Sequence, residues 1–322
     1  MEDTAEEMVV VARDPAIQSP EVPGTADRRR VVTWLACAAC VLVFVGLLQE
    51  PNPESWATLS RYGDVPANDI WAGKYWALVT SVFVHLTWLH FVFNVYWLWI
   101  LGGTLERAIG SLRFLAFFVT AAFVSSGIEF AVAGTTGIGV SGVVYAIFGF
   151  MWIGSNCVDA FKKALPKQTL VLFFGWAVLC ILATLLRTMN VGNAAHVSGL
   201  LFGIGVASVF TLRKRVPLML AGLSALILAA VVPLFWAPWS AEWVAKQAYA
   251  SHARHEYPHA VLLYQRTVDL GGNRVWALSN MTRAYAAMNN EQKFEETLDR
   301  LRQLDENAAH ELERTFADRR DK

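Results

Sequence analysis

Seven long apolar stretches, separated by short polar ones, dominate the first 236 residues of the chain. They span residues 31–48, 82–103, 112–133, 140–158, 169–186, 193–212 and 217–236. Each approaches the length that a helix needs to cross about 30 Å of hydrocarbon. The polar, proline-containing residues 1–27 precede them, and we expect this segment to be a disordered tail. The pattern therefore predicts an all-α, polytopic membrane protein.

The connection between the first two stretches, residues 50–81, mixes polar side chains with many aromatic ones. Its Trp and Tyr residues are Trp56, Tyr62, Trp71, Tyr75 and Trp76. Because Trp and Tyr concentrate at the membrane–water interface, we expect a partly embedded loop with short amphipathic helices.

Basic residues are distributed unevenly over the connections. One alternating set holds Arg28, Arg29 and Arg30, then Arg107 and Arg113, then Lys162, Lys163 and Lys167, then Arg213, Lys214 and Arg215. The opposite set holds only Arg61, Lys74 and Arg187. Since cytoplasmic loops are enriched in Lys and Arg, we expect the N-terminus and the basic connections in the cytoplasm. Seven crossings then place the chain after residue 236 outside.

Composition agrees with a membrane protein. The hydrophobic fraction is 55% and the mean hydropathy is +0.38. The formal net charge is zero, so there is no global basic surface that would suggest nucleic acid as a partner. The four cysteines lie in apolar runs, so we expect neither a zinc site nor a disulfide framework: Cys37, Cys40, Cys157 and Cys180.

Residues 238–322 are soluble in character and helical in pattern. Residue pairs that match at an offset of 34 residues include Ala250 with Ala284, Ala253 with Ala287, Leu270 with Leu304, and Asn273 with Asn307. This period resembles that of two degenerate tetratricopeptide repeats. An unrelated helical hairpin is the alternative.

Four polar side chains within the apolar stretches are candidates for chemistry when they are taken together. Ser141 begins the fourth stretch, and His196 lies near the start of the sixth. His90 and Asn94 are four residues apart and share one face of the second, which also carries His85. The topology brings all of these residues to the outer side. Inserting a polar group into a membrane helix costs free energy, on the order of a few kcal/mol for a charged group. Each such residue is therefore a functional candidate.

These residue types suit nucleophilic catalysis. A serine hydroxyl becomes a nucleophile when a base such as the neutral His196 takes its proton. The N–H of Ser141, the Asn94 amide and His90 can donate to the oxyanion that forms. No intramembrane aspartate offers a third member, so the residues indicate a Ser–His dyad.

Small and aromatic neighbours support this interpretation. Gly139 and Gly142 flank Ser141 and leave room for a substrate backbone, although small residues also serve simple helix packing. Tyr145 lies one helical turn after Ser141 and could stack on the His196 ring. Gly199 and Gly203 follow His196 at three and seven residues and form a glycine stripe that would let two helices press together.

Together these motifs resemble the rhomboid family of intramembrane serine proteases. The matching segments are Gly139-Val140-Ser141-Gly142 with Tyr145, the run from Ala195 to Gly203, the run from His85 to Asn94, and Leu101-Gly102-Gly103-Thr104-Leu105-Glu106. The resemblance covers about residues 30–212. It implies a six-helix core, a Ser141–His196 dyad, oxyanion contacts from Ser141, His90 and Asn94, single-span membrane proteins as substrates, and no cofactor. One departure is Ala77, where the family often has an arginine after the tryptophan.

We therefore predict four parts: a tail at 1–27, a rhomboid core at 28–215, a seventh transmembrane helix at 216–237, and a soluble helical tail at 238–322. The protein is expected in a bacterial inner (plasma) membrane, with the site opening to the outer side. The tail would hold a substrate segment or a protein partner, or merely pack on the loops. The alternatives to a protease are a catalytically inactive rhomboid-like binding protein and a transporter. A transporter would need paired intramembrane carboxylates, which the sequence lacks.

Overall fold

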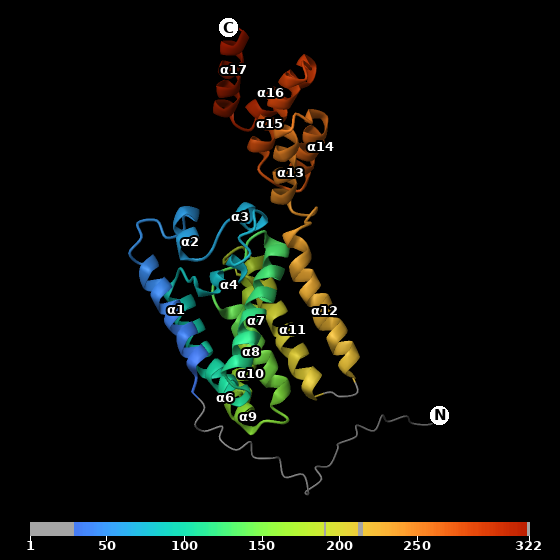
Figure 1. Ribbon diagram of the computed structural model, residues 1–322. Coiled ribbons are helices and arrows are strands. Elements are labelled where there is room, and N and C mark those ends of the chain that lie inside the picture. The colour runs from blue at the N-terminus through green and yellow to red at the C-terminus, as the bar shows by residue number, and fades with distance from the viewer. Residues whose placement is uncertain (1–28, 190, 212–214, 321–322) are drawn as a thin grey trace, which may run out of the picture.

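The computed structural model describes residues 29–189, 191–211 and 215–320, and these residues form helices and connections without a strand. The expected disordered tail at 1–27 lies outside them, as do Arg28, Arg213 and Lys214. Figure 1 shows a helical bundle with a smaller helical domain stacked on one end.

Two membrane-length helices, α7 and α11, enclose a shorter one, α8, at the centre of the bundle (Figure 1). The bundle consists of α1 (Val31–Leu47), α5 (Trp88–Trp97), the π-helical η2 (Leu98–Gly102), α6 (Gly103–Ile109), α7 (Ser111–Ala133), α8 (Ser141–Gly154), α10 (Lys167–Leu185), α11 (Asn193–Thr211) and α12 (Val216–Val231) with η4 (Val232–Leu234). Short helices fill the connections: α2 (Trp56–Tyr62), α3 (Ala67–Trp71), α4 (Ala77–Thr80), η1 (Ser81–Phe83) and α9 (Asp159–Ala164).

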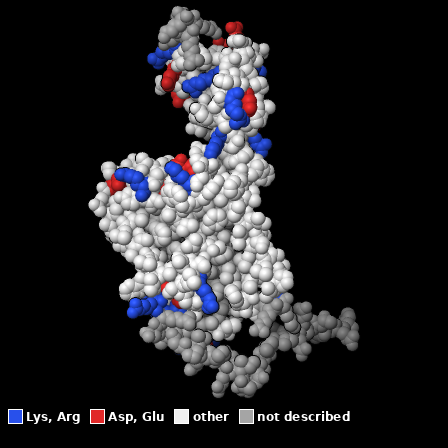
Figure 2. Space-filling view, viewed as in Figure 1, with Lys and Arg blue, Asp and Glu red and all other residues white. Residues whose placement is uncertain are grey.

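Four helices of the described chain are long and apolar enough to cross a membrane: Ser111–Ala133, Lys167–Leu185, Asn193–Thr211 and Val216–Leu234. A fifth span results if Ala77–Phe83 and Trp88–Ile109, which meet at a bend of 104°, are counted as one. The apolar helices α1 and α8 are shorter, with 17 and 14 residues. Between two charged levels, the visible face carries no Lys, Arg, Asp or Glu (Figure 2), as expected of a surface that contacts lipid.

Two predicted helix boundaries were wrong. The helix expected over residues 140–158 ends at Gly154, because the chain turns there into α9 and Phe161 packs against the glycine at a distance that leaves little room for a side chain. The second stretch does not form one helix from residue 82. Thr87 caps the start of α5, its hydroxyl accepting from the His90 N–H, so His85 precedes the helix.

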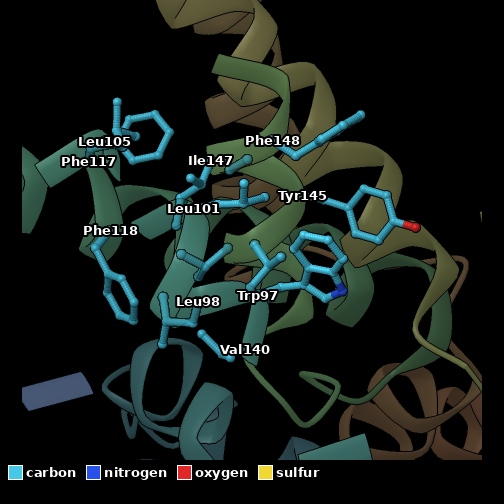
Figure 3. Close-up of a cluster of buried hydrophobic side chains, with 14 of the residues drawn as sticks. Trp97, Leu98, Leu101, Leu105, Phe117, Phe118, Val140, Tyr145, Ile147 and Phe148 are labelled. Atoms are coloured by element: carbon cyan, nitrogen blue, oxygen red, sulfur yellow. The ribbon is translucent and has the colours of Figure 1, made fainter. Parts of the chain in front are cut away.

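The interior of the bundle is built around α8. Figure 3 shows Tyr145, Ile147 and Phe148 of this helix in one apolar cluster with Trp97, Leu98 and Leu101 of the second stretch. Most side chains of α8 are buried, whereas α10 and α12 leave most of their surface exposed. In lipid, helices associate through close packing and small residues rather than through exclusion of water. The central helix is therefore held from all sides, and α10 and α12 lie at the periphery.

The loop expected between residues 50 and 81 is present and is braced without the family arginine. Ala77, which occupies that position, is fully buried. Thr136 Oγ1 donates to Asp64 Oδ1 at 2.8 Å, and both side chains are buried. Trp71 Nε1 donates to the Pro233 carbonyl at 3.0 Å. The loop is thus held by the connection after α7 and by η4.

The C-terminal domain has five helices among the described residues: α13 (Ala241–Ala253), α14 (Tyr257–Asp269), α15 (Arg274–Ala287), α16 (Glu291–Arg302) and α17 (Glu306–Arg320). Successive helices pack as hairpins around a separate apolar core that includes the fully buried Tyr264. The helical character of the tail was expected. Its relation to tetratricopeptide repeats stays a prediction.

Candidate active site

Ser141 and His196, from helices that begin 52 residues apart, meet at one end of the bundle. Ser141 is the first residue of α8, and His196 lies in the first turn of α11. His196 Nε2 lies 2.8 Å from Ser141 Oγ. His196 is buried and Ser141 is half-buried. At this distance the ring nitrogen can accept the hydroxyl proton directly.

Glycines allow this approach. A Cβ at Gly199 would overlap the Gly142 carbonyl oxygen and come within 2.9 Å of its carbon. A Cβ at Gly203 would come within 2.7 Å of the Ala146 carbonyl carbon. Real Cβ atoms essentially never make contacts under 3.0 Å. Both glycines of the predicted stripe therefore lie where α11 touches the backbone of α8.

Tyr145 lies against the His196 ring, as the spacing predicted. The two rings stack with centroids 4.7 Å apart and planes at 28°. The Tyr145 hydroxyl donates to the Phe173 carbonyl at 3.0 Å, which fixes the position of the tyrosine ring. His196 Nδ1 is buried and has no hydrogen-bond partner in the described part of the chain, so no carboxylate orients the ring there.

His85 and His90 lie close to Gly139, just before Ser141. A Cβ at Gly139 would overlap the His90 ring, and the residue has a φ of +94°, so both space and backbone require glycine. His85 Nδ1 is 3.1 Å from the Phe83 carbonyl, and His85 Nε2 accepts from the Val140 N–H at 3.4 Å. This pair of bonds assigns the proton to Nδ1. The buried Asn94 donates from Nδ2 to the His90 carbonyl at 2.8 Å.

Sequence reasoning missed two residues of this region. It grouped His85 with the second helix and gave it no specific contact. It gave no role to Glu129, yet Glu129 Oε2 accepts from the Ala195 N–H at 2.9 Å. A carboxylate within an apolar stretch was the available signal, but its partner lies 66 residues away.

The chemistry available here is that of a serine and its base beside several hydrogen-bond donors. The residues described include no group of three or more His, Cys, Asp or Glu placed to hold a metal ion. A serine hydroxyl within hydrogen-bond distance of a histidine ring nitrogen is suited to acyl transfer.

Comparison with known proteins identifies the domain that carries these residues. Residues 72–215 match the rhomboid domain, so the chain contains a domain of this kind. It is a multi-pass membrane protein.

Among curated proteins, the chain is similar to rhomboid protease GlpG. It is 31% identical over 193 residues to the protein of Salmonella choleraesuis (strain SC-B67) and to that of Salmonella newport (strain SL254). It is 30% identical to the protein of Salmonella paratyphi A (strain ATCC 9150 / SARB42). Each match covers 59% of this chain and 66% of the relative, so the chain spans just under two thirds of their length.

Proposed function

We propose that this protein is an intramembrane serine endopeptidase that cleaves single-span membrane proteins with a Ser141–His196 dyad. The observation that carries the proposal is the 2.8 Å distance between Ser141 Oγ and His196 Nε2. The rhomboid proteases to which the chain is similar support the same reaction class. No cofactor is required, because the serine and the histidine supply the nucleophile and the base.

In the proposed reaction, Ser141 Oγ attacks the scissile carbonyl carbon while His196 Nε2 takes the hydroxyl proton. The C–N bond then breaks, and His196 returns the proton to the leaving amine nitrogen. The acyl group stays on Ser141. Water attacks the ester, with His196 again accepting a proton, and release of the acid regenerates the serine.

Three groups are proposed as donors to the oxyanion that forms when the Ser141 hydroxyl attacks. The N–H of Ser141 is at the start of α8, where the first amides of a helix have no partner within it. The Asn94 amide has two hydrogens, and only one is used by the His90 carbonyl. The half-buried His90 ring is held beside Gly139. These groups would stabilise the negative charge that develops on the carbonyl oxygen.

The distribution of basic residues supports an outward orientation of the site in a bacterial inner membrane. The described residues of the N-terminal and α6–α7 connections include Arg29, Arg30, Arg107 and Arg113. Ser141 lies at the opposite end of the bundle. A substrate would then be cut at or near the outer face.

The decisive experiment is labelling of purified protein in detergent with a fluorophosphonate, together with cleavage of a single-span reporter. Wild type should be labelled and should cleave, whereas Ser141→Ala and His196→Ala should do neither while keeping the wild-type melting temperature. Because the two residues act as one unit, the double variant should lose no more than either single variant. A wild type that binds the reporter but neither reacts nor cleaves would favour the inactive rhomboid-like binding protein.

The C-terminal domain is proposed to hold the exposed segment of a substrate or of a partner protein near the site. A cavity of about 1110 Å³ lies between this domain, α3 and the end of α7. Its lining includes the exposed apolar side chains of Val132, Trp239, Tyr249 and Leu270. A segment retained there would have a raised effective concentration at the site.

Filling the cavity tests this role. Ala245 lines it, and Ala245→Trp should weaken cleavage of a reporter with a long outer segment but not of a short one. Ala287→Trp, at an exposed position of α15, serves as the control. Equal effects of Ala245→Trp on both reporters would contradict the role.

A further inference from the structure

Glu129 is a buried carboxylate of α7 that reaches the helix carrying His196. It is 6% exposed, and its Oε2 accepts from the Ala195 N–H at 2.9 Å. Ala195 directly precedes His196. An amide at this position of a helix has no partner within its own helix, and a negative charge at a helix N-terminus is stabilising. The contact thus fixes the turn of α11 from which the His196 ring projects.

The same turn is bounded on its other side by α8. A Cβ at Gly142 would meet the Ala195 carbonyl oxygen at 3.3 Å. The peptide between Ala195 and His196 therefore lies against Gly142, which directly follows Ser141. Glu129 also lies close to the connection before Ser141, since a Cβ at Gly137 would meet its Cγ at 3.1 Å. One side chain therefore contacts both the segment that leads to the serine and the segment that carries the histidine.

His196 has little else to hold its ring. Its Nδ1 has no hydrogen-bond partner among the described residues, and Tyr145 stacks on one face. A carboxylate at Nδ1 would orient the His196 ring as a third member of the site. Here the orientation of the ring must come instead from the backbone of α11.

We propose that Glu129 is a positioning residue for the Ser141–His196 pair: by capping the start of α11 it sets the distance between Nε2 and Oγ. This inference rests on the proposed function. Glu129 touches neither substrate nor the reacting atoms, and it acts through the backbone at Ala195.

The test compares Glu129→Leu, which removes the acceptor but fills the space, with Glu129→Gln, whose carbonyl oxygen can still accept from Ala195. Glu129→Leu should lower kcat on a reporter by about 10- to 100-fold, because a displacement near 1 Å can cost about 10²-fold. Its KM should change less than twofold. Fluorophosphonate labelling of Ser141 should slow in parallel, and Glu129→Gln should recover most of kcat.

Glu106 provides a matched control. It is also a buried carboxylate that caps a helix from a distance, accepting from the Val32 N–H at 2.9 Å and the Thr33 N–H at 2.8 Å, but α1 carries no residue of the site. Glu106→Leu should lower the melting temperature at least as much as Glu129→Leu while leaving kcat of the folded enzyme within about threefold. If Glu129→Leu keeps wild-type kcat, or if Glu129→Gln is as slow as Glu129→Leu, the proposal is wrong.

Hydrogen exchange separates this inference from the proposed function. Amides of residues 193–199 should exchange faster in Glu129→Leu than in wild type, whether or not the protein cleaves anything. If the wild type proves inactive, the proposed function fails, but faster exchange would still support the capping role. Unchanged exchange would overturn it.

Discussion

Gly199 offers the sharpest test of how the two site helices are held together. An alanine there places a Cβ against the Gly142 carbonyl, within 2.9 Å of its carbon and closer still to its oxygen. Ordinary van der Waals contact begins at about 3.4 Å, and both partners are helix backbone, which cannot rotate away. Relieving the overlap with the oxygen requires α11 to move from α8 by on the order of 1 Å, which can cost about 10²-fold in rate.

Gly199→Ala should therefore lower kcat by about 10²-fold, and Gly199→Val by more, since a branched side chain adds further overlap. The assay is reporter cleavage in detergent with kcat and KM determined separately. Gly175→Ala is the matched control, because a Cβ at Gly175 of α10 meets nothing within 4 Å. A Gly199→Ala enzyme with the kcat of the control would show that the helices are not held at the distance described here.

Three further predictions address the oxyanion donors, the topology and the loop. Asn94→Ala and His90→Ala should each lower kcat about 10²- to 10³-fold with little change in KM; unchanged kcat in both would reduce them to packing residues. A cysteine at Asn289 should react with a membrane-impermeant thiol reagent in cells with a permeabilised outer barrier, whereas the exposed native Cys157 should react only after lysis; the reverse pattern would invert the topology. Burial raises the pKa of Asp64 to about 6. Above that pH the buried carboxylate is ionised, which lowers the free energy of unfolding. This loss is absent below pH 4. Asp64→Asn should thus raise the free energy of unfolding by up to about 3 kcal/mol at pH 8 and by nothing at pH 4; equal changes in melting temperature at both pH values would contradict this.

The sequence predicted the long helices well, because each is a continuous apolar stretch with polar ends. Helix α7 begins one residue before the expected range 112–133 and ends with it, and α11 begins at the expected residue 193. The proximity of Ser141 and His196 was also expected from sequence, because a histidine in such a stretch is rare enough to attract notice. Contacts between segments that are distant in the sequence could not be predicted in this way. The hydrogen bonds from the Ala195 N–H to Glu129 and from the Trp71 indole to the Pro233 carbonyl depend on tertiary packing, which local pattern does not encode.

His85 shows how composition misleads at a boundary. The residues around it are apolar, so the stretch looks continuous from residue 82. The local signal was Thr87, a good N-cap residue, whose side chain binds the first turn of α5. Apolar periodicity locates a span, but capping chemistry decides where its helix starts.

The short α8 and the break in the second span are linked by one requirement, the hydrogen bonding of backbone groups at membrane depth. At 14 residues α8 is about 21 Å long, less than the roughly 30 Å of hydrocarbon, so the chain before Ser141 must run without a helix at membrane depth. Unpaired backbone groups are not tolerated there. Gly139 N–H donates to the Ser81 carbonyl at 3.3 Å, and Val140 N–H donates to His85. Both acceptors exist because η1 and residues 84–87 interrupt the second span. The interruption that hid His85 from sequence analysis thus satisfies the backbone before Ser141.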